Sequence, residues 1–306
     1  MSPTDADPAR PDGTLESDLE SAAVTTPDSL AQTKGRGVRW PGSVLAVPPL
    51  RPRAALTRRQ VLTETWLVLL VSLGASAVWS AISLLRKALE ARAAGTSLST
   101  KTSTLNASRS SLEWLDAISQ FVGIALALVP AALAAHLLGR SMRNPLGFIG
   151  LDGTRKGPDA VLGALLAAVI GLPGLALYLG ARAAGLNTTV VASGLSDHWW
   201  VVPVLVLAAV QNALLEEVVM VGYLFTRWSQ AGWGRTKVIV VSALIRGGYH
   251  LYQGIGGFVG NVVMGLIFGW LYTRTRRVMP LVVAHTILDI VSFVGYALLK
   301  PHVSWL

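Results

Sequence analysis

Two adjacent glutamates lie inside a long apolar stretch of this chain. The stretch runs from Val201 to Phe225, reads VVPVLVLAAVQNALLEEVVMVGYLF, and has Glu216 and Glu217 as its only charged residues. A helix of this length can cross a bilayer, where an unpaired and dehydrated carboxylate is costly. The sequence therefore predicts a membrane protein with a specific use for two buried acids. A functional site and a structural ion pair between helices are the two explanations that this pattern leaves open.

The composition also favours a membrane protein. Of the 306 residues, 52% are hydrophobic and 14% charged, and the mean hydropathy is +0.52. Globular chains carry about 25% charged residues. The net charge of +9 comes mainly from basic residues between apolar blocks, as around transmembrane helices, and we expect no nucleic-acid partner. The chain has no cysteine, which excludes disulfides, thiolate nucleophiles and cysteine–zinc sites.

Two regions follow from the distribution of apolar residues. Residues 1–60 are rich in Pro, Asp, Ser and Thr, lack the apolar core of a signal peptide, and become basic near their end. We expect them to form a disordered cytoplasmic tail, because such a segment cannot bury enough apolar surface to fold. Residues 61–306 are predicted to form an all-α, polytopic bundle of about seven transmembrane helices. The apolar blocks are about 61–85, 112–138, 159–181, 199–226, 237–253, 255–273 and 279–299.

The basic residues of the connecting segments predict the orientation. With the amino terminus in the cytoplasm, most of them fall on the cytoplasmic side. One basic cluster opposes this assignment; it lies in the first external loop and comprises Arg86, Lys87, Arg92, Lys101 and Arg109. The balance still favours a multi-pass protein of the cell membrane with a cytoplasmic amino terminus.

Five titratable residues stand in apolar segments downstream. Three separate predicted helices contribute them: Glu216 and Glu217, then His250, then His285 and Asp289. At ~1.5 Å per residue, Glu216, His250 and His285 lie ~15, ~20 and ~9 Å from the inner ends of their helices, which places them in roughly one layer. These are the side chains that general acid–base hydrolysis uses, and they favour a hydrated site over scattered core histidines.

Spacing within each segment adds detail. His285 and Asp289 are four residues apart, as are Arg246 and His250, so each pair shares a helix face. Glu216 and Glu217 are neighbours that point about 100° apart, so we expect one to face the site and the other a neighbouring helix.

A metal site is one interpretation of these residues. Glu216, His250 and His285 would suit zinc with one open position, although no HExxH is present. A glutamate base with histidines that stabilise an oxyanion requires no metal. The sequence leaves both open.

Three ordered motifs resemble the CPBP family, the Abi group of intramembrane endopeptidases related to the type II CAAX prenyl proteases. They are EEVVMVG from Glu216, RGGYH ending at His250, and HTILD from His285 to Asp289, within a family-like core of about residues 150–300. The resemblance implies a helical membrane protease that cleaves membrane-anchored proteins or peptides. It further implies Glu216 as the water-activating base, His250 as its partner, and His285 with Asp289 as ligands of the oxyanion or water.

Two positions depart from the family pattern. The arginine of EExxxR is Val221 here, and the usual phenylalanine four residues before the first histidine is Arg246. An unpaired arginine and an unpaired glutamate at similar depth would each be costly, so we expect Arg246 to pair with Glu217 as structural support for the site. The competing interpretation has Arg246 bind a substrate carboxylate. The alternatives to an endopeptidase are an inactive scaffold or chaperone of the same fold and, less favoured, a transporter or proton relay.

Overall fold

The computed structural model describes residues 56–195, 197–299 and 302, all within one compact unit of the chain. The predicted tail of residues 1–60 falls largely outside the described residues and stays a prediction. Within the described part, the helices are α1 (Arg58–Leu70), α2 (Leu73–Ala93), α3 (Glu113–Ala127), α4 (Val129–Gly139), α5 (Pro145–Phe148), α6 (Lys156–Ala183), α7 (Val201–Glu216), α8 (Leu224–Gln230), α9 (Arg235–Tyr249), α10 (Ile255–Thr275) and α11 (Met279–Leu299).

The predicted polytopic helical bundle is confirmed, but the count of about seven spans is not. Five helical stretches are long and apolar enough to cross a membrane, namely Glu113–Gly139, Lys156–Ala183, Val201–Gln230, Ile255–Thr275 and Met279–Leu299. A sixth arises if α1 and α2, bent by 51°, form one broken span. The remaining expected span is α9, whose 15 residues reach about 22 Å at ~1.5 Å each, short of a ~30 Å hydrocarbon core.

The outer surface of the bundle is apolar. On α6, Leu172 is 74% exposed and Val169 and Leu165 are exposed as well. Apolar side chains that face outward cost nothing in lipid, whereas soluble proteins rarely expose contiguous patches of them. This surface agrees with a multi-pass membrane protein.

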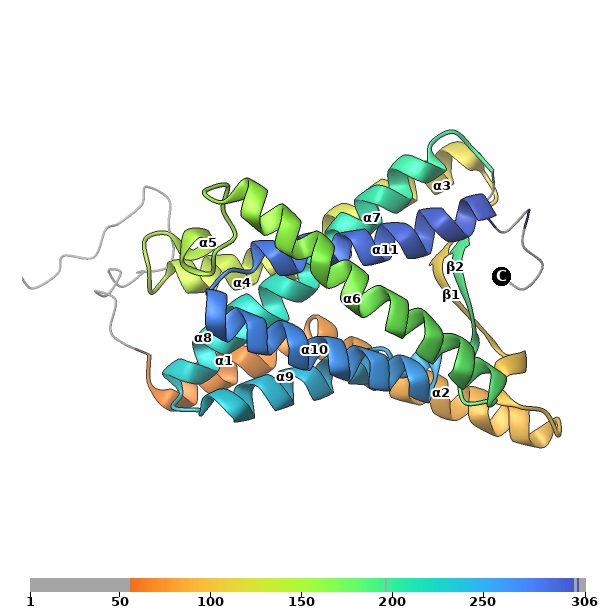
Figure 1. Cartoon of the computed structure of the whole chain (residues 1–306), viewed down its shortest axis with the longest axis horizontal. Helices are drawn as coiled ribbons and strands as arrows, with labels where there is room; N and C mark the ends of the chain where they lie inside the picture. Colours follow the sequence, from red (N-terminus) through yellow and green to blue (C-terminus); the bar gives the residue numbers. More distant parts are fainter. Residues whose placement is uncertain (1–55, 196, 300–301, 303–306) are drawn as a thin grey trace, which may run out of the picture. The chain divides into compact units, whose positions relative to one another are not determined.

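Close helix packing assembles the part of the bundle that carries the three sequence motifs. α10 packs against α9 and α6, and α11 packs against α6 and α7. Figure 1 shows α6 crossing over α10 and α11. A Cβ atom on Gly265 of α10 would lie 2.9 Å from the Cα of Ala243 in α9, so glycine is what lets these two helices approach.

A two-stranded parallel sheet, which the sequence analysis did not predict, lies between two groups of helices. Its strands are β1 (Thr102–Ala107) and β2 (Thr189–Gly194), with Thr102 opposite Thr189 and Ala107 opposite Gly194. In Figure 1 they run from the end of α2 and α6 towards the ends of α3 and α11. Each strand is short and mixed in polarity, and each finds its partner far along the chain. Local periodicity therefore gives little sign of the pairing.

Candidate active site

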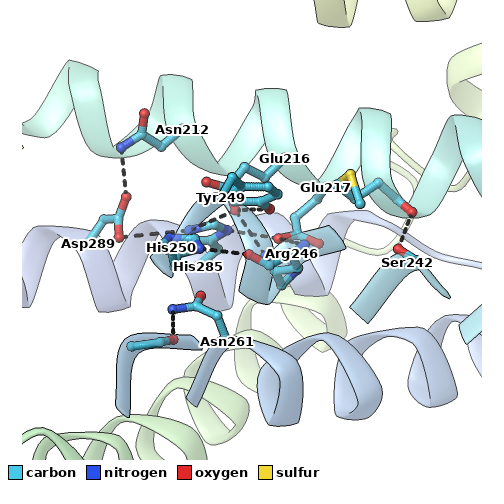
Figure 2. A network of polar contacts seen from close by, with 12 residues as sticks. Asn212, Glu216, Glu217, Ser242, Arg246, Tyr249, His250, Asn261, His285 and Asp289 are labelled. Atoms are coloured by element: carbon cyan, nitrogen blue, oxygen red, sulfur yellow. Dashed lines mark hydrogen bonds and ion pairs between the residues drawn. The ribbon is translucent and has the colours of Figure 1, made fainter. Parts of the chain in front are cut away.

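The two glutamates lie where α7 changes its winding. Glu216 is the last residue of α7, and Glu217 begins a π-helical segment, Glu217–Tyr223, that leads into α8. Single π turns inside α-helices occur frequently at functional sites. Glu216 is 8% exposed and Glu217 is fully buried. Figure 2 shows both carboxylates directed at the same group of polar side chains from α9 and α11.

Arg246 of α9 bridges the two acids. Its Nη2 donates to Oε1 of Glu217 at 2.7 Å and its Nη1 donates to Oε2 of Glu216 at 3.1 Å. The guanidinium is 1% exposed and lies over the ring of Phe268, 5.6 Å from its centroid. The predicted pairing of Arg246 with Glu217 is confirmed. The two glutamates share this arginine, and the expectation that one faces the site and the other a neighbouring helix stays a prediction.

His285 and Asp289 of α11 extend the cluster. Nδ1 of His285 lies 2.8 Å from Oε1 of Glu217, while Nε2 lies 4.0 Å from Oε2 of Glu216 and 3.8 Å from Oδ1 of Asp289. The contact between His285 and Asp289 agrees with their predicted common face. Oδ2 of Asp289 accepts a hydrogen bond from Nδ2 of Asn212 in α7, at 3.1 Å.

His250 follows the last residue of α9, beside the cluster. Its Nδ1 lies 3.1 Å from the main-chain oxygen of Arg246, one turn earlier. A carbonyl oxygen only accepts, so Nδ1 carries the proton of this bond and Nε2 is left as an acceptor in the neutral ring. Among the described residues, His250 forms no ion pair with either glutamate, although Figure 2 places it next to Tyr249 and His285.

Two residues of the site escaped the sequence analysis. The hydroxyl of Tyr249 donates to Oε2 of Glu216 at 2.7 Å, and Asn212 holds Asp289. Both carry a signal in hindsight: Asn212 stands four residues before Glu216 on the same helix face, and Tyr249 directly precedes His250 in an apolar segment. Asn261, visible near the cluster in Figure 2, hydrogen-bonds the carbonyl of Gly257 in its own helix at 3.0 Å.

Elements outside α9 fix the turn after His250. The main-chain nitrogen of Tyr252 donates to Oγ of Ser80 in α2 at 2.6 Å. The carbonyl of Tyr252 accepts from Oγ of Ser103 at 2.8 Å and from Nζ of Lys87 at 3.3 Å. The sheet and α2 therefore hold both main-chain polar groups of Tyr252, the second residue after His250, and so restrict the backbone next to the histidine.

An ion-pair network anchors the start of α11, which carries His285. Nη2 of Arg277 lies 2.6 Å from Oδ2 of Asp159 in α6 and 2.8 Å from Oδ1 of Asp152. The pKa of Asp152 is held well below its usual value, mainly by the hydrogen bond from Arg277 and next by the hydrogen bonds from Thr154. Arg277 precedes α11 by two residues, so the network fixes where that helix begins.

The residues that could hold a metal differ in one member from the expected set. Ligand atoms of Glu216, Glu217 and His285 lie within 4.8 Å of one another, so Glu217 takes the place expected for His250. Arg246 already donates to both carboxylates in this group. Its positive charge balances part of the negative charge that a cation would otherwise balance.

The comparison with known protein families agrees with the geometry. Residues 198–291 match the family described as Type II CAAX prenyl endopeptidase Rce1-like. No curated protein and no solved structure gives a significant match to the chain. The matched segment carries every side chain of the cluster from Asn212 to Asp289. The resemblance predicted from the three motifs is therefore confirmed, and residues 198–291 are similar to the Rce1-like type II CAAX prenyl endopeptidases.

Proposed function

We propose that this protein is an intramembrane endopeptidase in which Glu216 activates water to cleave membrane-associated proteins or peptides. The family match supports a protease of the CAAX type, and the apolar helices around the site favour substrates that are held in the membrane. The cluster of acids, histidines and one arginine at the centre of these helices supplies the groups that hydrolysis requires.

The observation that carries the proposal is a difference in hydrogen bonding between the two carboxylate oxygens of Glu216. Oε2 accepts hydrogen bonds from Nη1 of Arg246 at 3.1 Å and from the hydroxyl of Tyr249 at 2.7 Å. Oε1 has no hydrogen-bond partner within the described part of the chain. A carboxylate held by one oxygen presents the other in a fixed direction, as a general base requires. Glu217 is less suited to this role because it is fully buried and contacts Arg246 and His285.

The histidines have separate tasks in this proposal. His250 offers Nε2 as an acceptor and orients the water together with Glu216. His285 is held through Nδ1 by Glu217, and its Nε2 lies near Glu216 and Asp289. In its imidazolium form it donates Nε2–H to the oxyanion that forms when water adds to the scissile carbonyl. The water proton passes to Glu216 and then to the departing amine, which restores the base. Arg246 is a positioning residue in this proposal, because it holds both carboxylates in place.

The test is a cleavage assay with purified full-length protein and membrane peptides, both prenylated and unprenylated near their carboxyl termini. Glu216→Gln keeps the shape of the side chain but removes its basicity, so turnover should fall by a factor of ~10²–10⁴ or more. Glu90→Gln, which changes an exposed acid of α2, is the matched control and should cleave like the wild type. Folding of both variants is checked by gel filtration and circular dichroism. Full turnover by a folded Glu216→Gln variant would exclude Glu216 as the base.

A further inference from the structure

A cavity outside the candidate active site lies between α1 and α4. Its volume is about 580 Å³, within the ~300–1,000 Å³ that is typical of sites for small ligands. It shares no lining residue with the cluster around Glu216. The lining residues are Leu56, Arg59, Gln60, Thr63, Glu64, Leu67, Val68, Val71, Leu133, Leu137 and Arg140.

The cavity is polar at one end and apolar at the other. Along α1, Arg59 comes in the first turn, and Leu67 and Val71 come two to three turns later, so the lining extends about 18 Å at ~1.5 Å per residue. Along α4 the order is reversed: Leu133 comes first and Arg140 follows the last helical residue. Since Arg59 and Arg140 mark opposite ends of their own helices yet line one cavity, the two helices present their basic ends together.

The two arginines at the polar end are exposed, and neither forms an ion pair with any residue of the described ranges. The acid in the lining, Glu64, is engaged elsewhere. Its Oε1 lies 2.9 Å from Nε of the buried Arg227 and accepts a hydrogen bond from the hydroxyl of Tyr223 at 3.0 Å. The polar end therefore has positive charge that the described lining leaves uncompensated.

We propose that this cavity binds an anionic phospholipid, with the phosphate between Arg59 and Arg140 and one acyl chain along Leu67, Val71 and Leu133. Basic pockets between transmembrane helices bind anionic headgroups because cation and phosphate attract in a region of reduced polarity. The apolar lining beyond Glu64 has no polar group that would require a water-soluble ligand. A lipid satisfies both ends of the cavity at once.

The lipid would also stabilise the π-helical segment Glu217–Tyr223, which carries part of the candidate active site. Glu64, in the lining, is bonded to Tyr223, and Tyr223 is the last residue of the π-helical segment that begins with Glu217. A ligand that binds only the folded protein raises its thermal midpoint, so the lipid should stabilise the protein as it binds.

The experiment uses full-length protein in detergent, titrated with dioleoyl phosphatidylglycerol or dioleoyl phosphatidylcholine, and counts bound lipid by native mass spectrometry alongside thermal unfolding. The wild type should prefer the anionic lipid by about tenfold or more. Arg59→Gln and Arg140→Gln should each reduce this preference by roughly fivefold, as expected for about 1 kcal/mol per basic residue near an anionic headgroup. Inorganic phosphate should not compete, because it lacks the acyl chain.

Two neighbours provide matched controls. Arg58 is adjacent to Arg59 in the sequence, and Arg143 follows Arg140 by three residues. Both are exposed arginines that do not line the cavity, so Arg58→Gln and Arg143→Gln should keep the preference. Leu133→Trp should weaken both lipids equally by filling the apolar end. Arg59→Lys and Arg140→Lys keep the charge and should keep the preference, which separates loss of charge from misfolding.

Equal binding of the two lipids by the wild type would overturn the proposal. So would a preference that falls as much in Arg58→Gln and Arg143→Gln as in the cavity variants, because the attraction would then belong to the basic surface as a whole. Competition by inorganic phosphate would identify a plain anion site instead. None of these readouts depends on proteolysis, so failure here leaves the proposed function untouched.

Discussion

Arg246 and Glu217 form a fully buried ion pair at 2.7 Å that joins α9 to the π-helical segment after α7. The same guanidinium reaches Glu216 at 3.1 Å. Arg246 therefore holds both acids in position, including the proposed base Glu216 and the acid Glu217 that contacts His285. Arg246 stands where the family pattern has a phenylalanine, and Val221 stands where it has an arginine. Arg246 therefore provides the positive charge that an arginine at position 221 would supply.

Loss of this arginine should destabilise the protein. Arg246→Phe leaves two buried carboxylates without their counter-ion, and breaking a buried pair typically costs about 3–5 kcal/mol. Adding Val221→Arg should recover part of that stability by restoring a local pair with Glu217. The measurement is the thermal midpoint of purified protein, with Arg235→Phe, at an exposed position of the same helix, as the control. Unchanged stability in Arg246→Phe, or no recovery in the double variant, would contradict this account of the pair.

Removal of the Tyr249 hydroxyl should impair catalysis more than folding. Tyr249→Phe keeps the ring but frees Oε2 of Glu216 from one of its donors. Hydrogen bonds to charged groups are worth about 1.5–3 kcal/mol, so turnover should fall by roughly 10- to 100-fold. Tyr252→Phe is the matched control, because its hydroxyl accepts only from the side chain of Gln253 in the described structure. Similar losses in both variants would show that the bond to Glu216 has no special role.

Water should reach the site but not the outer face of α6. The chain has no cysteine, so single cysteines can be labelled in membranes without background. His250→Cys, at a half-buried position, should react with a small polar thiol reagent, and Glu217→Cys, at a fully buried one, should react more slowly. Leu172→Cys should resist the polar reagent although Leu172 is 74% exposed, because lipid covers it. A protected His250→Cys would indicate a dry core, and a reactive Leu172→Cys would contradict the assigned lipid face.

The Asp152–Arg277 pair predicts loss of stability in acid. Arg277 depresses the pKa of Asp152 in the folded protein, so the pair stabilises the fold at pH values above the unfolded pKa of about 3.9. That contribution is lost as the pH falls towards the depressed folded pKa. The thermal midpoint of the wild type minus that of Asp152→Asn should be constant above about pH 5 and shrink below about pH 4. Parallel curves for the two proteins down to pH 2.5 would contradict the assignment.

The sequence was sufficient for the class of fold and for most members of the site. Long apolar blocks have no stable alternative to membrane helices, because backbone polar groups in lipid must be satisfied within the segment. Charged and titratable residues inside such blocks are rare enough to be noticed one by one. For this reason Glu216, Glu217, Arg246, His250 and His285 could be singled out before any contact was known.

The number of spans was harder to predict, because hydropathy does not show at which residue a helix ends. The apolar block expected at 237–253 contains α9 and a short turn, and the turn is held by Ser80, Ser103 and Lys87 from distant segments. Those contacts satisfy the main-chain polar groups of Tyr252 without a full membrane crossing. The parallel pairing of β1 with β2 depends in the same way on segments that only the folded chain brings together.

From its sequence alone, this protein is determined to be a polytopic helical membrane protein with acids and histidines in its apolar segments, because composition and spacing are local properties. Tertiary structure decided which atoms meet. It brought Arg246 into ion pairs with both glutamates. It also brought Tyr249 into a hydrogen bond with Oε2 of Glu216, and Asn212 into one with Asp289. These contacts depend on the rotation of each helix about its axis and on the π-helical turn at Glu217. Both result from packing between helices, which no single segment encodes.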